Sequence, residues 1–319
     1  AFVVNQFNLP AASVPYFYNW SAIIFPGMIV GAFCLRQFRK VLKSDLLRFL
    51  TAISILMVAD FESRTFLSFT YFSAFFVAVV TALALVDDSE EIPWWAWFSP
   101  ILMFSKAAVL AVLPVMILVA MVSKSRFRWI TIVVVALGIV QILHMAISAN
   151  AGVMPFRAND ISFVSKVIAS FNYFFGFLGA YVIGHTFQLS KYFLMMTGLF
   201  IFCISGFIFF YKKCNSGALI IIGLSLLFFN VLLNSFALSD RWNTDMRELD
   251  SIRVYRHIIV GFFGCILVVS GFFSALTNHK ITEPGGFLRK NLGAILFFVW
   301  FIGSGWFSYG QLVSREPSS

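Results

Sequence analysis

Nine long apolar runs impose the strongest constraint on how this sequence can fold. Each run is about 20 residues long and is bounded by charged residues, proline or glycine. The runs are 17–36, 66–86, 98–122, 129–149, 164–185, 192–211, 217–238, 257–276 and 292–312. A helix of about 20 residues crosses the ~30 Å hydrocarbon core of a bilayer, whereas a β-barrel needs alternating segments of about ten residues. The pattern therefore predicts an all-α, polytopic transmembrane helix bundle.

The amino-acid composition excludes two other classes of protein. Of the 319 residues, 60% are hydrophobic and only 12% are charged, which is about half the charged fraction of an ordinary soluble domain. These values exclude a water-soluble enzyme and a disordered segment. The 41 phenylalanines have side chains that form no conventional hydrogen bonds, and they suit surfaces that face lipid or another helix.

A tenth apolar run, Phe49 to Asp60, is only a dozen residues long. It is a short tilted helix, a re-entrant segment or an interfacial helix, which gives about 9–10 spans. If it does not cross the membrane, one side collects fifteen lysines and arginines and the other side seven; if it crosses, the count becomes nearly even. Positive charge concentrates on the cytoplasmic side, so we expect a run that does not cross, with 37–65 inside and the loop 87–97 outside.

The connectors between the runs are too short to fold alone, so residues 1–319 are predicted to form a single integral membrane domain. The net charge of +9 lies almost entirely in these connectors and favours contact with anionic lipid headgroups over nucleic acid. The four cysteines are scattered singly, which indicates neither a metal site nor a disulfide framework. No signal peptide is recognisable in residues 1–15, and a first residue of Ala1 rather than Met is compatible with a processed or truncated chain whose upstream segment is not included.

Polar groups inside the apolar runs are the first candidates for function, because an ionisable side chain costs at least about 2.5–3.5 kcal/mol in hydrocarbon. Lys106 lies nine residues beyond Trp97, near the middle of a continuous helix over 98–122. It must face a partner, a cavity or a lipid phosphate, or else extend its ammonium group toward the interface. His144 with Gln141, and Asn230 with Asn234, place polar groups on single faces of two helices, where they more often join helices than bind substrate.

The connector 240–257 holds the densest group of charges, with four arginines and four acidic residues. Arg253 and Arg256 share a helical face with His257 adjoining, and Arg247 lies in the same stretch. Guanidinium groups bind phosphate in bidentate geometry, so Arg247, Arg253, Arg256 and His257 are candidate ligands of a lipid-linked phosphate. The alternative is an interfacial helix whose opposite charges pair locally.

Two carboxylates follow the short apolar run. Asp60 and Glu62 can hold a divalent cation or deprotonate a sugar acceptor, whereas the simpler interpretation is a solvated helix end. No dedicated metal centre is indicated, and the sequence holds no phosphate-binding loop, hydrolase nucleophile motif, zinc protease motif or dinucleotide fingerprint.

Three segments carry a resemblance to a known family: Asp60-Phe61-Glu62 beside the short run, the stretch from Phe104 to Pro114 around Lys106, and Arg253 to His257 leading into an apolar helix. In these the chain resembles the multispanning glycosyltransferases of the GT-C class and, more loosely, bacterial membrane proteins that modify or polymerise O-antigen. The resemblance implies a base or metal partner at Asp60 or Glu62, and contacts to the donor phosphate at Lys106, Arg253 and Arg256. It also implies the bacterial inner membrane as location.

The expected function is therefore the transfer of a sugar from a polyprenyl-phosphate donor to a cell-surface glycan. Membrane lipid, the donor and other proteins of a membrane complex are the expected partners. The family places its acidic motif on the outer face, whereas the favoured charge count leaves Asp60 inside. Two alternatives stay open: a transporter or flippase of a lipid-linked or small anionic solute, using Lys106, His144 and Asn230, and a non-catalytic membrane subunit.

Overall fold

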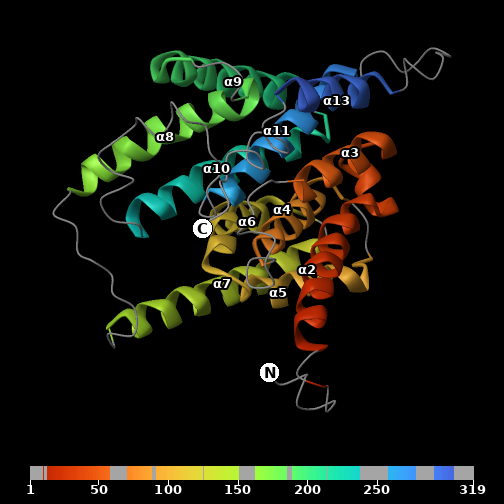
Figure 1. Cartoon of the computed structure of the whole chain (residues 1–319), viewed down its shortest axis with the longest axis vertical. Helices are drawn as coiled ribbons and strands as arrows, with labels where there is room; N and C mark the ends of the chain where they lie inside the picture. The colour runs from red at the N-terminus through yellow and green to blue at the C-terminus, as the bar shows by residue number, and fades with distance from the viewer. Residues whose placement is uncertain are drawn as a thin grey trace.

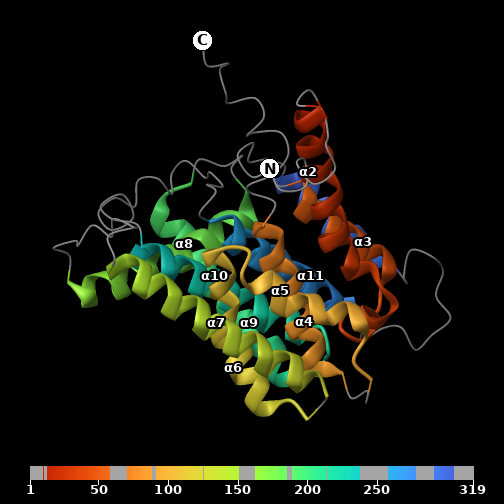
Figure 2. The same ribbon diagram turned by 90° about the horizontal axis from the view of Figure 1, so that it is seen from below.

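The computed structural model describes residues 10, 13–57, 70–87, 91–124, 126–150, 162–184, 189–212, 214–237, 258–277 and 291–304. Within these ranges the chain is a bundle of helices without a strand, which confirms the all-α prediction (Figures 1 and 2). Helices α10 (Gly217–Ala237) and α11 (Ile259–Thr277) occupy the middle of the bundle (Figure 1). They contact α8 (Phe163–Ile183) and α9 (Lys191–Lys212) on one side and α4 (Tyr71–Val86) on the other.

Six helices are long and apolar enough to cross a membrane, so the protein is an integral membrane protein. They are α2 (Val14–Gly31, extended to Cys34 by the 3-10 helix η2), α7 (Phe127–Asn150), α8 (Phe163–Ile183), α9 (Lys191–Lys212), α10 (Gly217–Ala237) and α11 (Ile259–Thr277). Two further predicted runs appear as shorter apolar helices within the described residues. These are α4 (Tyr71–Val86) and α13 (Leu292–Ser304).

The one remaining predicted run, 98–122, is broken, and the prediction of a continuous helix there is wrong. Helix α5 (Phe98–Met103) ends before Lys106, and the chain resumes as the 3-10 helix η6 (Ala107–Val112) and helix α6 (Leu113–Val122) at an angle of 114°. Lys106 has extended backbone (φ −161°, ψ 147°) and therefore lies at a bend rather than in mid-helix. Two turn hydrogen bonds satisfy part of the backbone there, from Ser105 N to Leu102 O and from Val109 N to Lys106 O, both 3.0 Å long.

The two ends of α4 define two ends of the surrounding bundle. At its last turn, Lys40 forms an ion pair with Asp87, and Ser123 Oγ donates to Ala84 O over 2.7 Å. Asn215 joins the same region, because its Nδ2 donates to Lys40 O over 2.9 Å. We call this the Lys40 end. At the first turn of α4, Lys106 packs on Tyr71, and we call this the Lys106 end.

Lys40 and Thr70 lie at opposite ends of α4, a helix of 16 residues that is about 24 Å long. Helix α3 (Asp45–Leu56) follows Lys40 in the sequence and is held to α11 by a 2.8 Å hydrogen bond between Thr51 Oγ1 and Ser270 Oγ. The arrangement favoured by the Lys/Arg count, with 37–65 on one side of the membrane, stays a prediction, because residues 58–69 lie outside the described residues.

Helices α10 and α11 pack through glycine. A Cβ atom built on Gly264 would lie 2.4 Å from Gly223 O and 3.0 Å from Leu227 N, so the two backbones are in direct contact. Small residues at such positions are the usual means of close helix packing in membranes, where lipid offers no hydrophobic drive for association. Asn230 adds to this contact, since its buried Oδ1 accepts a 3.2 Å hydrogen bond from Gly261 N.

We predict that Gly264→Ala lowers the stability of the bundle by about 1–3 kcal/mol, because the added methyl group meets backbone atoms that cannot rotate away. Thermal unfolding in detergent measures the effect as a lower Tm. Gly206→Ala in α9 is the matched control, since nothing lies within 4 Å of its added Cβ. Equal Tm values for the two variants would contradict the packing described above.

Candidate functional site

The Lys106 end joins the helices that follow the two charged connectors predicted to carry function. Phe72 at the start of α4 stacks on Phe263 at the start of α11, with ring centroids 5.4 Å apart. In sequence, α4 follows the connector with Asp60 and Glu62, and α11 follows the connector with the arginine cluster. The helices that follow these connectors therefore begin side by side.

Six of the seven predicted site residues lie outside the described residues: Asp60, Glu62, Arg247, Arg253, Arg256 and His257. The seventh, Lys106, is described. The roles predicted for the six therefore remain predictions, and the chemistry of the site is built from Lys106 and its surroundings.

Lys106 holds its ammonium group at the bend between α5 and η6. Its Nζ lies 3.7 Å from the centroid of the Tyr71 ring, in cation–π geometry, and the Tyr71 side chain is buried. Ser105 Oγ lies 3.5 Å from Thr70 O, so the bend is joined to the start of α4 at two neighbouring residues. A half-buried lysine fixed at a break in an apolar segment places one positive charge at the Lys106 end.

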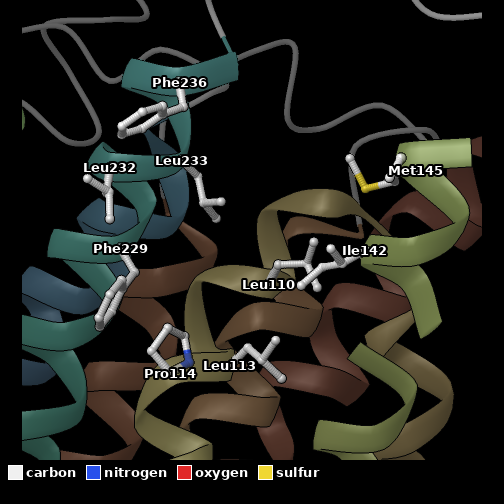
Figure 3. A pocket seen from close by; sticks show the side chains of 10 residues that line it. Leu110, Leu113, Pro114, Ile142, Met145, Phe229, Leu232, Leu233 and Phe236 are labelled. Carbon is white, nitrogen blue, oxygen red and sulfur yellow. The ribbon is translucent and has the colours of Figure 1, made fainter. Parts of the chain in front are cut away.

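An apolar groove begins one helical turn beyond Lys106. Its volume is about 540 Å³, within the range of pockets that take small molecules. Side chains of η6 and α6 face those of α7 and α10 across it (Figure 3). The lining consists of Leu110, Leu113, Pro114, Ile142, Met145, Ala146, Phe229, Leu232, Leu233 and Phe236. A groove without a polar side chain suits a hydrocarbon chain.

The groove and Lys106 lie toward the same end of the bundle. Leu110 follows Lys106 by four residues, and Phe236 lies at the last turn of α10, immediately before the arginine-bearing connector. Phe236 contacts Phe163 at the first residue of α8, with centroids 5.5 Å apart. The arrangement therefore combines a cation with an apolar groove, which is the combination that an amphiphilic anion requires.

The other polar residues predicted inside the membrane do not line this groove. His144 is exposed on α7. Asn230 joins α10 to α11 through the hydrogen bond from Gly261, which confirms the helix-joining interpretation for this residue. The groove was missed in the sequence because its ten apolar side chains come from three separate segments.

A second polar cluster, at the Lys40 end, was also missed. Arg48 of α3 is only 2% exposed and donates from Nη1 to Leu35 O at 2.5 Å and to Cys34 O at 3.4 Å. It also pairs through Nη2 with Asp45, and Arg39 Nε donates to the same carboxylate at 2.8 Å. The one signal in the sequence is the i, i+3 spacing of Asp45 and Arg48.

Hydrogen bonding from Arg39 is the main cause that lowers the pKa of Asp45 to about 2; burial opposes it and Arg48 assists. Because this pKa is depressed in the folded state, the stabilisation is complete above the ordinary value of 3.8 and is lost as the pH falls through about 2. The carboxylate is therefore ionised throughout the physiological range.

In the part of the chain that the structure describes, no group of three or more His, Cys, Asp or Glu side chains could hold a metal ion. Asp60 and Glu62 lie outside those residues, so a divalent cation at this pair remains a prediction.

No known protein family matches the chain, and neither a curated protein nor a solved structure matches it significantly. The resemblance to GT-C glycosyltransferases therefore stays a prediction from three short segments. Among the described residues, the features that bear on function are the groove, Lys106 and the helix ends around them.

We predict that Arg48→Met destabilises the protein by about 2 kcal/mol, because the carbonyl groups of Cys34 and Leu35 lose a charged donor. Arg48→Lys should recover only part of the loss, since an ammonium group lacks the planar fork that reaches both carbonyls and Asp45. Thermal unfolding in detergent measures both variants. Arg128→Met, at an exposed position, serves as control. A Tm for Arg48→Met equal to that of the control would refute the assigned contacts.

Proposed function

We propose that the protein is a membrane glycosyltransferase that takes its sugar from a polyprenyl-phosphate donor and transfers it to a cell-surface glycan of the O-antigen kind, in the bacterial inner membrane. The observation that carries the proposal is the position of Lys106, at the bend of a broken span and one turn from a wholly apolar groove. A donor of this class has a long apolar chain attached to a phosphate, and the two features match these two parts.

The apolar groove supports a lipid-linked donor over a soluble one. A nucleotide sugar would need polar contacts to its base and ribose, whereas all ten residues that line the groove are apolar. An isoprenoid chain gains free energy by leaving water for such a surface, at roughly 25 cal/mol per Å² buried. The phosphate that ends the chain would then lie toward the Lys106 end, where the ammonium group balances its charge.

The reaction assigns a separate task to each predicted residue. Asp60 or Glu62 removes the proton from the acceptor hydroxyl, whose oxygen forms a bond to the anomeric carbon of the sugar. The bond from that carbon to the phosphate oxygen breaks, and polyprenyl phosphate leaves with the electron pair. Lys106, assisted by Arg247, Arg253, Arg256 and His257, stabilises the negative charge on the departing phosphate.

The packing of α4 on α11 supports a common location for the proposed base and the proposed phosphate ligands. The connector with Asp60 and Glu62 precedes α4, and the first turn of α4 packs on α11 through Phe72 and Phe263. The arginine-bearing connector precedes α11 itself. The proposed base and the proposed phosphate ligands thus belong to connectors that lead to the same end of the bundle.

A transporter draws less support from the same observations. Of the three residues that suggested a solute pathway, His144 is exposed on α7 and Asn230 is engaged with Gly261. Neither lines the groove. Lys106 alone remains, and it is explained equally by donor binding.

We predict that Lys106→Met lowers the rate of sugar transfer by at least about tenfold, because one charge-assisted contact to the leaving phosphate is lost. Lys106→Arg should retain more activity than Lys106→Met, since it keeps the positive charge. Transfer from a synthetic polyprenyl-phosphate sugar to the glycan acceptor by purified protein provides the measurement. Lys124→Met, an exposed lysine at the Lys40 end, is the matched control.

The same assay examines the other assigned roles through Asp60→Ala, Glu62→Ala and Arg256→Ala. Loss of transfer in the acidic variants with intact donor binding is expected for a base. Wild-type rates in all three variants and in Lys106→Met would exclude the proposed function.

We further predict that Leu233→Trp raises the KM for a donor with a long isoprenoid chain, because the larger ring narrows the groove where Leu233 lines it. A donor with only two isoprene units should be affected much less, since it fills less of the groove. Steady-state kinetics with both donors tests this difference. Leu143→Trp, an exposed position of α7 outside the groove, is the control. An equal ratio of the KM for the long donor to the KM for the short donor in the two variants would show that the isoprenoid chain binds elsewhere.

A further inference from the structure

A second pocket, lined mainly by charged side chains, lies at the Lys40 end. Its volume is about 360 Å³, and it is lined by Cys34, Arg36, Arg39, Asp45, Arg48 and Phe49. Three guanidinium groups face a single carboxylate, so the pocket holds an excess of two positive charges. Such an excess attracts an anion.

Two of the arginines retain donors that no described residue uses. Arg48 is only 2% exposed. Its Nη1 and Nη2 both form hydrogen bonds, but its Nε has no hydrogen-bond partner. A buried N–H group without an acceptor is rare in proteins and calls for a ligand or water. Arg36, which is exposed, forms no ion pair with any residue in the part of the chain that the structure describes.

The position of the pocket indicates which anion it meets. The candidate membrane span Val14–Cys34 ends at Cys34, which lines the pocket, so the arginines lie where hydrocarbon gives way to headgroups. Apolar side chains surround them: Leu35, Leu46 and Phe49 are 39%, 37% and 52% exposed. A soluble anion would make no apolar contact with these three side chains, whereas the acyl chains of a lipid would cover them.

We infer that this pocket binds the phosphate group of an anionic phospholipid, with Arg36, Arg39 and Arg48 as its ligands. Guanidinium groups bind phosphate oxygens in pairs, and the N-terminus of α3 at Asp45 adds the positive end of a helix dipole. The excess positive charge disfavours a zwitterionic lipid, because the choline cation would lie near the arginines. The site lies at the opposite end of α4 from Lys106, so it is independent of the proposed donor site.

Titration of the purified protein with phosphatidylglycerol, followed by native mass spectrometry, tests the site. Arg36→Gln is the informative variant, since Arg36 is exposed and its loss leaves the Arg48 contacts in place. Its apparent affinity for phosphatidylglycerol should fall about tenfold, the effect of losing one charge-assisted contact. Arg128→Gln removes one exposed charge at the same end of the bundle and should bind like the wild type.

Two further titrations identify the source of the phosphate. Phosphatidylcholine should bind the wild type more weakly than phosphatidylglycerol, and its binding should not depend on Arg36. Inorganic phosphate at millimolar concentration should not compete with phosphatidylglycerol. Equal affinity of wild type and Arg36→Gln for phosphatidylglycerol would overturn the inference, as would equal binding of the two lipids or full competition by inorganic phosphate.

Discussion

The need of every backbone N–H and C=O group in hydrocarbon to find a partner within the protein governs this structure. Continuous helices meet the requirement, and most of the described chain is helical. The bend at Lys106 interrupts one apolar segment. Turn hydrogen bonds replace some of the helical ones there, and the bend packs on α4. A break of this kind in a membrane protein is expected only where it is buried in protein or lines a cavity, which is why it marks the candidate site.

The contact between α10 and α11 helps to position the residues at the Lys106 end. Gly223 and Gly264 allow the two backbones to touch, and Asn230 adds a hydrogen bond near the start of α11. Phe263 of α11 then stacks on Phe72, which positions the first turn of α4 and, with it, the ring of Tyr71 against Lys106. Packing by small residues is thus linked through aromatic contacts to the location of one positive charge.

The two ends of the bundle hold their positive charge in different surroundings. At the Lys106 end the ammonium group lies near an apolar groove within the bundle, which suits a ligand with a long chain. At the Lys40 end the arginines lie at the margin of a span, with exposed apolar side chains beside them, which suits a lipid of the surrounding bilayer. The same attraction between cation and phosphate therefore serves catalysis in one proposal and anchoring in the other.

The sequence by itself determined the all-α class, the membrane location and the helix-joining role of Asn230, because these follow from run length, composition and spacing along a single helix. Only the tertiary structure decided three other features. No proline or glycine lies at the bend around Lys106 to indicate it in the sequence. The burial of Arg48 depends on the carbonyl groups of Cys34 and Leu35, which belong to the segment before α3. The position of α3 on α11 depends on the hydrogen bond between Thr51 and Ser270. Periodicity and charge counts describe neighbours along the chain, whereas these features arise from contacts between residues distant in sequence.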